Sequence, residues 1–246
     1  MLVTSKINKA GMNIAKECEK LGLKVHYCEE GILEIKELPN ADAYMFLSTH
    51  RSESKMPCFT SHFPGIFGTD VSHGGNPKEL AHTYPTLQKV YMRALNSLKM
   101  PELEKFQVVI EATHHGPTHF KKPVMFVEIG SSEEEWQNKA AAELIAKSVK
   151  KTLEMIKNEK FTKTAIGFGG THYPEKFTEV IINGEFAIGH IFPKYQNEHM
   201  DKAIFDQMLE KSIEPVKYVL IDWKGINQKS VITDWAKNKD LEIVKI

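Results

Sequence analysis

The sequence predicts an α/β protein with a largely parallel, doubly wound sheet. Short apolar runs rich in β-branched residues alternate with longer stretches of helical periodicity, an alternation typical of parallel strands joined by helices. The chain has 246 residues, which is enough to bury a sizeable core. Because no repeat, low-complexity tract or linker interrupts it, we expect one α/β domain over residues 1–246.

The first 50 residues predict four strands and one helix. Asn8 is a favourable N-cap, and apolar residues follow it at helical spacing until Gly22 ends the helix. Turn residues separate the expected strands, which are 2–5, 23–27, 32–35 and 44–48.

Residues 50–77 break this regularity. The stretch has no sustained period and contains three prolines and four glycines. Loops longer than ~15 residues without regular structure are usually functional or disordered. Its aromatic residues and histidines argue against disorder, because disordered segments carry few aromatics. We therefore expect a long, ordered active-site loop at about 50–77.

Regular alternation resumes at residue 79. An amphipathic helix at 79–100 ends before Pro101, and a capping box at 131–135 begins a helix that runs to about residue 158. We expect the strand at 108–110 to be buried and central. The other expected strands are 124–129, 164–170, 186–192, 218–222 and 241–244, and the other helices are 175–182, 197–212 and 226–238.

The composition is that of a globular cytoplasmic protein. The 32 basic and 32 acidic residues balance, so the global charge gives no sign of a nucleic-acid footprint, although a local basic patch remains open. Three cysteines without a CxxC pair fit a reducing compartment. No apolar run approaches the ~20 residues needed to span a bilayer, so no membrane partner is expected.

Three Thr-His dipeptides stand at the ends of predicted strands. They place His50 after the strand at 44–48, His114 after 108–110 and His172 after 164–170. If the three strands lie in one sheet, these side chains converge at the edge where α/β sheets bind ligands. Neutral imidazole is a normal ligand of zinc, and a catalytic zinc ion keeps three protein ligands and one open position. The sequence therefore predicts a Zn²⁺ site formed by His50, His114 and His172.

Two glutamates lie close to these histidines in the chain. Glu111 opens the turn that carries His114 and His115, and Glu128 is the only charge in the strand at 124–129. A buried carboxylate is costly unless it is paired or bound to metal, so Glu128 is a ligand or base, or it is held by a structural hydrogen bond. His115, Glu111 and Glu128 are the candidate catalytic groups. His190, inside a strand, is either a core histidine or a fourth ligand.

Other common catalytic patterns are absent from the sequence. It contains no HExxH zinc signature, no GxSxG nucleophile elbow and no Walker lysine motif. Cys58 lacks a predicted helix amino terminus that would lower the pKa of its thiol. The glycines at 167–170 are a weak indication of a phosphate or oxyanion site, and backbone crowding at the His172 turn explains them equally well.

Six sequence blocks together resemble the archaeal and plant type of D-aminoacyl-tRNA deacylase. They are 48–53 (STHRSE), 61–65 (SHFPG), 74–77 (GGNP), 111–118 (EATHHGPT), 128–130 (EIG) and 167–173 (GFGGTHY). The resemblance implies a zinc-dependent hydrolase that cleaves the ester between a D-amino acid and the terminal ribose of tRNA, as chiral proofreading requires. It also implies a three-layer α/β/α fold with a mixed, largely parallel sheet, like those of phosphorylases and peptidyl-tRNA hydrolases.

A set of polar and aromatic residues is the expected contact surface for the acceptor end of such a tRNA. Basic side chains at Arg51, Lys121 and Lys122 suit the terminal phosphates, and a wall built from the loop suits the amino acid. The expected substrate-binding residues are Arg51, His62, Phe63, His73, Thr118, Lys121 and Lys122. A surface salt bridge is an equally good account of Arg51.

Three rival functions fit the same residues. A zinc aminopeptidase or amidohydrolase would use the same histidines and glutamates on small amides. A phosphorylase-like enzyme would need phosphate and no metal, and a zinc-stabilised RNA-binding module would bind without turnover. The sequence leaves open whether the protein is a monomer or a homodimer.

Overall fold

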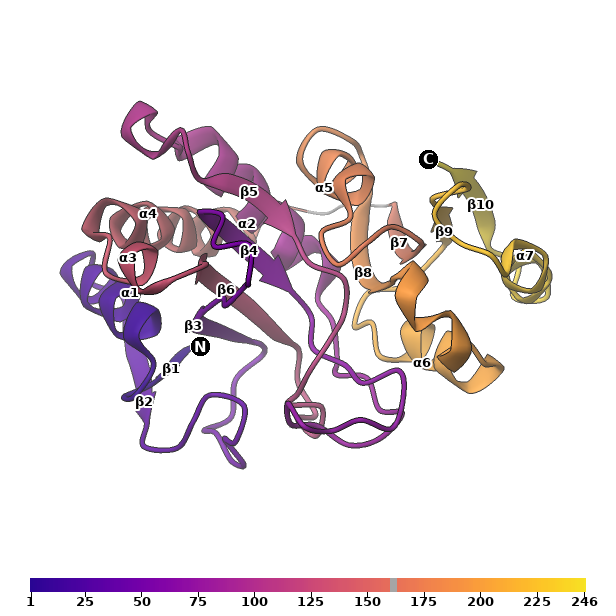
Figure 1. The fold of residues 1–246 in the computed structure, drawn as a ribbon, viewed down its shortest axis with the longest axis horizontal. Helices are drawn as coiled ribbons and strands as arrows, with labels where there is room; N and C mark the ends of the chain where they lie inside the picture. Colours follow the sequence, from indigo (N-terminus) through magenta and orange to yellow (C-terminus); the bar gives the residue numbers. More distant parts are fainter. Residues whose placement is uncertain (160–162) are drawn as a thin grey trace.

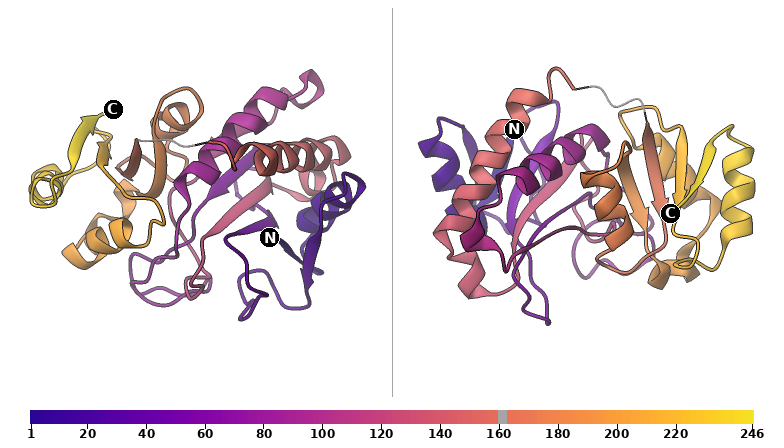
Figure 2. Two further views of the ribbon diagram at one scale, coloured as in Figure 1. Left: turned by 180° about the vertical axis from the view of Figure 1, so that it is seen from behind. Right: turned by 90° about the horizontal axis from the view of Figure 1, so that it is seen from above.

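The structure, a computed structural model, describes residues 1–159 and 163–246. Its strands form two sheets that lie side by side (Figures 1 and 2). The larger sheet contains β1 (Leu2–Ser5), β2 (Val25–Cys28), β3 (Tyr44–Thr49), β4 (Cys58–His62), β5 (Gln107–Ile110) and β6 (Val124–Gly130). The smaller sheet contains β7 (Thr164–Phe168), β8 (Ala187–Phe192), β9 (Tyr218–Ile221) and β10 (Glu242–Lys245).

The larger sheet has the strand order β2-β1-β3-β6-β4-β5. Strand β4 runs antiparallel to β6, and the other neighbouring strands are parallel. Helices α1 (Lys9–Lys20) and α4 (Lys139–Met155) bury one face of this sheet. Loop residues, among them Ile35 and Phe120, cover the apolar part of the other face. The candidate site lies on this second face.

The smaller sheet is fully parallel, with the order β10-β9-β7-β8. Helix α5 (Glu175–Ile182) packs on one face, while α6 (Lys202–Glu210) and α7 (Lys229–Lys237) pack on the other. This sheet is therefore doubly wound, with helices in the layers above and below it. Helix α2 (Pro85–Leu98) packs against both α4 and β8 and so joins the two sheets.

The predicted fold class, a largely parallel α/β protein with flanking helices, is confirmed. The expectation that the three Thr-His strands share one sheet is wrong, because β7 belongs to the smaller sheet. The strand at 108–110 is an edge strand and not a central one. Hydrophobic periodicity shows which side chains of a strand face the core, but it does not show which strands are neighbours in a sheet. The positions of both strands within the sheets were therefore predicted wrongly.

Some predicted elements have different bounds. Residues 32–34 form a turn in place of the expected strand, and β4 lies inside the stretch expected to be a continuous loop. The helix expected from residue 79 begins only at Pro85, whose ring suits the first helical turn. Asn138 caps a new helix and so divides the one expected at 131–158 into α3 (Glu133–Trp136) and α4. The helix expected at 197–212 is likewise shorter, because a 3-10 helix (Lys194–His199) precedes α6.

None of the helices in the described ranges combines the length and apolar character that a bilayer crossing requires.

Candidate active site

Residues 111–114 tie the two sheets together. After β5, the Glu111 amide donates to the Ser61 carbonyl in the larger sheet at 3.0 Å. The next two amides donate across the junction, from Ala112 to the His172 carbonyl at 2.9 Å and from Thr113 to the Ile191 carbonyl at 3.0 Å. This crossing segment brings His172 from the smaller sheet to the histidines of the larger one.

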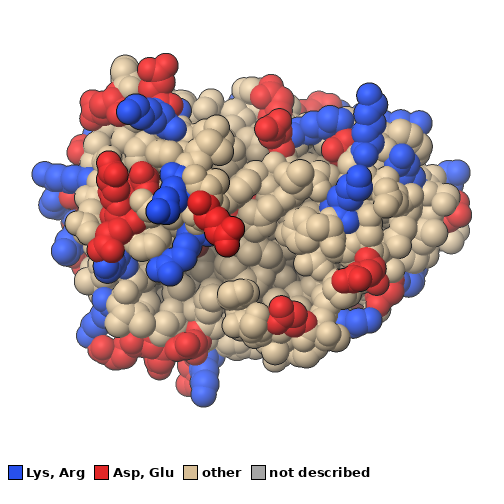
Figure 3. Space-filling model, in the orientation of Figure 1, with Lys and Arg blue, Asp and Glu red and all other residues tan. Residues whose placement is uncertain are grey.

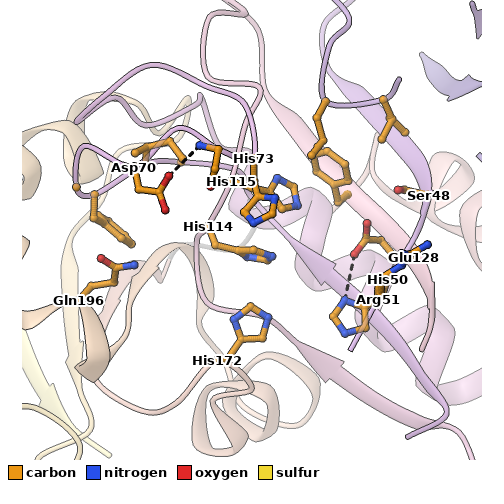
Figure 4. Close-up of a pocket in the computed structure, with 18 of the residues that line it drawn as sticks. Ser48, His50, Arg51, Asp70, His73, His114, His115, Glu128, His172 and Gln196 are labelled. Atoms are coloured by element: carbon orange, nitrogen blue, oxygen red, sulfur yellow. Dashed lines mark hydrogen bonds and ion pairs between the residues drawn. The ribbon is translucent and has the colours of Figure 1, made fainter. Parts of the chain in front are cut away.

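Seven polar side chains meet at this junction. They are His50, His62, Glu111, His114, His115, Glu128 and His172. His114, His115 and His172 lie on one side of the cavity in Figure 4, and His50 and Glu128 lie on the other. The ring centroids of His114 and His172 are 4.5 Å apart, and those of His50 and His172 are 6.4 Å apart. The structure thus brings together the three predicted ligands and the three predicted catalytic residues.

Glu111 is the centre of the cluster. Its Oε2 lies 2.7 Å from His172 Nε2 and 3.5 Å from His114 Nε2. Its Oε1 lies 3.3 Å from His50 Nδ1 and 3.5 Å from His62 Nδ1. Burial opposes ionisation, but the surrounding histidines outweigh it and hold the pKa of Glu111 well below its usual value. Glu111 is therefore a carboxylate enclosed by imidazoles.

Glu128 is the second buried carboxylate. It is 3% exposed, and its Oε2 accepts a hydrogen bond from Thr60 Oγ1 at 3.2 Å and lies 3.7 Å from His50 Nδ1. Because Glu128 also lines the cavity, one end of this carboxylate is available to a bound molecule. The structural hydrogen bond predicted from the sequence is therefore present, and the alternative role of Glu128 as a ligand or base stays a prediction.

His50 is held between the carboxylates and a tyrosine. Burial lowers the pKa of His50, but Glu111 and Glu128 outweigh that effect and raise it to about 12. The other ring nitrogen, Nε2, lies 2.6 Å from the Tyr173 hydroxyl. Both nitrogens of His50 thus already have partners, and the ring acts as an imidazolium beside two carboxylates.

His114 and His115 are neutral, and their tautomers follow from their hydrogen bonds. Burial and the neighbouring His62 lower the pKa of both, that of His115 to about 3. The Nδ1 of His114 donates to the Ala112 carbonyl at 2.8 Å, and the Nδ1 of His115 donates to the Gly116 carbonyl. Each Nε2 therefore carries a lone pair that points into the cluster.

The two lone pairs face different groups. His114 Nε2 points toward the Glu111 carboxylate, where no proton lies between two acceptors. His62 Nε2 lies 3.1 Å from His115 Nε2 and donates to it, and His62 Nδ1 lies 3.5 Å from Glu111 Oε1. Among the described residues, His62 Nδ1 and Glu111 Oε1 are buried without a hydrogen-bond partner. A cation between His114 Nε2 and Glu111 Oε2 would satisfy both atoms.

Three sets of donors are close enough to hold a metal ion. The sets, each with ligand atoms within 4.8 Å of one another, are His62-His114-His115, Glu111-His114-His172 and His50-Glu111-Glu128. The second set has two imidazoles and one carboxylate, a donor combination used by catalytic zinc sites. The predicted trio of His50, His114 and His172 is not among the sets found in the described residues, because His50 is turned toward the two carboxylates.

Two glycine-rich loops hold the histidine turn in place. A Cβ atom at Gly116 would lie 2.3 Å from the Gly75 amide nitrogen, so the two backbones touch where neither has a side chain. Thr118 Oγ1 accepts from the Asn76 amide at 3.0 Å and donates to Glu79 at 2.6 Å. These contacts explain why glycines and Thr118 accompany the histidines in the sequence blocks.

The cluster opens into a cavity of about 880 Å³. Of the predicted substrate-binding residues, Arg51 and His73 line this cavity, whereas His62 is fully buried behind His115. Phe63 is packed in the core, and Thr118 is buried in the loop contact. Lys121 and Lys122 are exposed and do not line the cavity wall.

Two tyrosines at the site were not predicted. Tyr173, the partner of His50, directly follows the Thr171-His172 pair, and that adjacency was the available signal. The hydroxyl of Tyr195 lies 3.3 Å from His172 Nδ1, but nothing in its sequence surroundings distinguishes it. His190 is a core histidine, because its ring bonds to the Thr113 hydroxyl and the Ala81 carbonyl, away from the cluster.

The fold and the site define an α/β protein with a histidine and carboxylate centre between two sheets. The family model for D-aminoacyl-tRNA deacylase matches residues 37–244. A D-aminoacyl-tRNA deacylase from Methanocaldococcus jannaschii is 37% identical over 253 residues, covering 98% of this chain and 97% of its own length. One from Pyrococcus furiosus is 34% identical over 277 residues, with 100% and 99% coverage. The chain belongs to the D-aminoacyl-tRNA deacylase family, and the resemblance found in its sequence blocks is confirmed.

A solved structure shares the whole fold. The crystal structure of a conserved protein of unknown function matches with a TM-score of 0.90 and 29% sequence identity, over 99% of this chain and 94% of that one. The arrangement of the two sheets is therefore common to both proteins.

Proposed function

We propose that this protein hydrolyses the ester bond between a D-amino acid and the terminal ribose of tRNA, and that it does so with a zinc ion bound in the histidine and carboxylate cluster. Membership of the D-aminoacyl-tRNA deacylase family supports the substrate. The observation that carries the zinc proposal is the His114 Nε2 lone pair, which faces the Glu111 carboxylate at 3.5 Å without a proton between them, in a set of three close donors completed by His172.

Glu111, His114 and His172 are the residues that would hold zinc. Two imidazoles and one carboxylate match the ion's preference for nitrogen and oxygen ligands. A zinc ion bound there would lower the pKa of a water molecule and polarise the ester carbonyl. His50, which the sequence placed among the ligands, would instead hold the charge of Glu111 and Glu128 and fix their orientation.

Glu128 is the group best placed to accept the proton of the attacking water. It lines the cavity, and only one of its oxygens is engaged by Thr60 and His50. Glu111, by contrast, is surrounded by four imidazoles and has no oxygen directed to the open cavity. General-base assistance of this kind contributes ~10²–10⁴-fold to a rate.

The first test compares D-tyrosyl-tRNA with L-tyrosyl-tRNA before chelation, after chelation and after zinc is restored. We expect cleavage of the D-ester alone, lost with the chelator and recovered with zinc. Equal cleavage of both esters would point to an unselective metallohydrolase. Cleavage of D-tyrosine amides in preference to both esters would favour the aminopeptidase or amidohydrolase alternative.

A further inference from the structure

A second cavity, of about 780 Å³, lies beside the active site at the carboxyl ends of β7 and β9. The chain leaves β7 toward β8 on one side and leaves β9 toward β10 on the other, so these two strands flank the point where the winding of the sheet reverses. Parallel α/β sheets bind ligands in the crevice at such a point. Gly170 follows β7 and Gly225 follows β9, and both line the cavity.

The charged side chains around this cavity are mostly lysines. Lys176, Lys194 and Lys224 line it, together with a single carboxylate, Asp222. Asp222 is engaged by Lys176, whose Nζ lies 2.8 Å from Oδ1 and also donates to the Ile246 carbonyl. Within the described parts of the chain, Lys194 and Lys224 have no carboxylate partner. The cavity therefore offers two exposed cations that suit phosphate groups.

Tyr195 connects the second cavity to the active site. Its side chain lines both cavities, and its hydroxyl lies 3.3 Å from His172 Nδ1. The residue is 52% exposed, so part of its side chain is open to contact with a base. A nucleic-acid strand lying along the second cavity would thus deliver its terminal nucleotide to the histidine cluster.

The opposite side of the active site is less suited to a phosphate chain. A groove there is lined by Lys9 and Arg51, but Lys9 pairs with Glu133 and the Arg51 guanidinium lies 5.2 Å from the centroid of the Trp136 ring. Lysines also gather on the part of the molecule that carries the carboxyl-terminal elements β9 and β10 (Figure 3). Two of them, Lys229 and Lys245, lie over the ring of Trp223.

We infer that the second cavity binds the phosphodiester backbone of the single-stranded acceptor end of tRNA, with Lys194 and Lys224 as phosphate contacts and Tyr195 as a stacking platform. This inference rests on the proposed function, since it names the part of the substrate that precedes the reacting adenosine. It differs from the contact surface expected from the sequence, because Lys121 and Lys122 do not take part.

The test uses three D-tyrosyl esters, which are those of full-length tRNA, the trinucleotide CCA and adenosine. The variant is Lys194→Gln/Lys224→Gln, and the matched control is Lys16→Gln/Lys24→Gln, which removes the same charge from exposed lysines near α1 and β2. We expect the kcat/KM of the variant to fall at least ~10-fold further with the tRNA and CCA esters than with the adenosine ester, chiefly because KM rises. Its plot of log(kcat/KM) against log[salt] should be shallower by about 1 to 1.5, because each single-strand phosphate contact contributes ~0.7.

Three outcomes would overturn the inference: equal kcat/KM of the wild type with CCA and adenosine, equal losses of the variant on all three esters, or a variant that matches the control. If the wild type cleaves none of the esters, the proposed function fails. The inference about the second cavity is then tested by measuring RNA binding. In that case fluorescence anisotropy with uncharged RNA ending in CCA should still show at least ~10-fold weaker binding by the variant than by the control. Equal binding there would also overturn it.

Discussion

His172 Nε2 lies 2.7 Å from Glu111 Oε2, although the two residues follow strands of different sheets. The contact exists because residues 112 and 113 donate backbone hydrogen bonds to the smaller sheet as soon as the chain leaves β5. The relative position of the two sheets therefore decides whether the donor set of Glu111, His114 and His172 is complete. A change that moves one sheet against the other should reduce activity even when it lies far from the cavity.

Glu111 and Glu128 should be separable by substitution. Glu111→Gln removes the carboxylate shared by four histidines, so we expect loss of bound zinc and at least a ~100-fold fall in kcat/KM. Glu128→Gln should keep zinc and lose activity to a similar extent, because it removes a base and not a ligand. Metal content by mass spectrometry and hydrolysis of D-tyrosyl-tRNA measure both effects. If Glu128→Gln also loses zinc, Glu128 is a ligand.

Alanine substitutions at the three Thr-His turns test the convergence of the histidines. We expect His50→Ala, His114→Ala and His172→Ala each to lower turnover at least ~100-fold with folding retained. His114→Ala and His172→Ala should also lose zinc, whereas His50→Ala should keep it, because His50 is bonded to carboxylates and to Tyr173. The control is His26→Ala on the edge strand β2. Near-normal turnover of all three variants would rule out the cluster as the active centre.

The sequence predicts the members of the site better than it predicts the sheets. Thr49-His50, Thr113-His114 and Thr171-His172 each follow an apolar run, so the chain itself marks them as strand ends. Strand β4 was missed because Thr60 and His62 are polar residues that face the site, which hides the alternation of an ordinary buried strand. The partner of each strand depends on packing between distant segments, and local periodicity carries no information about it.

The close contact of two loops behind His115 should not tolerate a methyl group. In Gly116→Ala the new Cβ would lie 2.3 Å from the Gly75 nitrogen, so the loops must separate. We expect a loss of about 1–3 kcal/mol of stability, as is usual for overpacking, and at least a ~10-fold fall in activity through displacement of His115. Gly22→Ala is the control. Its Cβ meets nothing within 4 Å, and its φ of +79° costs about 1 kcal/mol through the backbone alone. Full activity of folded Gly116→Ala would show that the loop contact does not position the site.

Glu214 should act as a remote cap of helix α2. The N-cap residue Tyr84 makes no side-chain capping bond, and the Thr86 amide and hydroxyl donate to Glu214 instead. Glu214→Ala should therefore lower the free energy of unfolding by about 1–2 kcal/mol, measured by urea denaturation. Glu210→Ala, at an exposed position on α6, should stay within about 0.5 kcal/mol of the wild type. Equal stability of the two variants would mean that the α2 amides need no cap.

The buried ring of His190 should make stability depend on pH. Burial lowers the pKa of His190 to about 4, and its nitrogens bond to the Thr113 hydroxyl and the Ala81 carbonyl in the neutral form. The unfolded chain binds a proton near pH 6.5, so the contribution of His190 is complete above that pH and is lost as the pH falls toward 4. The folded and unfolded pKa values of His190 differ by about two and a half units, which corresponds to about 3 kcal/mol of stability. We therefore expect the stability difference between wild type and His190→Gln to shrink by about that amount between pH 7 and pH 4, measured by urea denaturation. A constant difference for His190→Gln would show that the folded protein binds a proton at His190 as readily as the unfolded chain does.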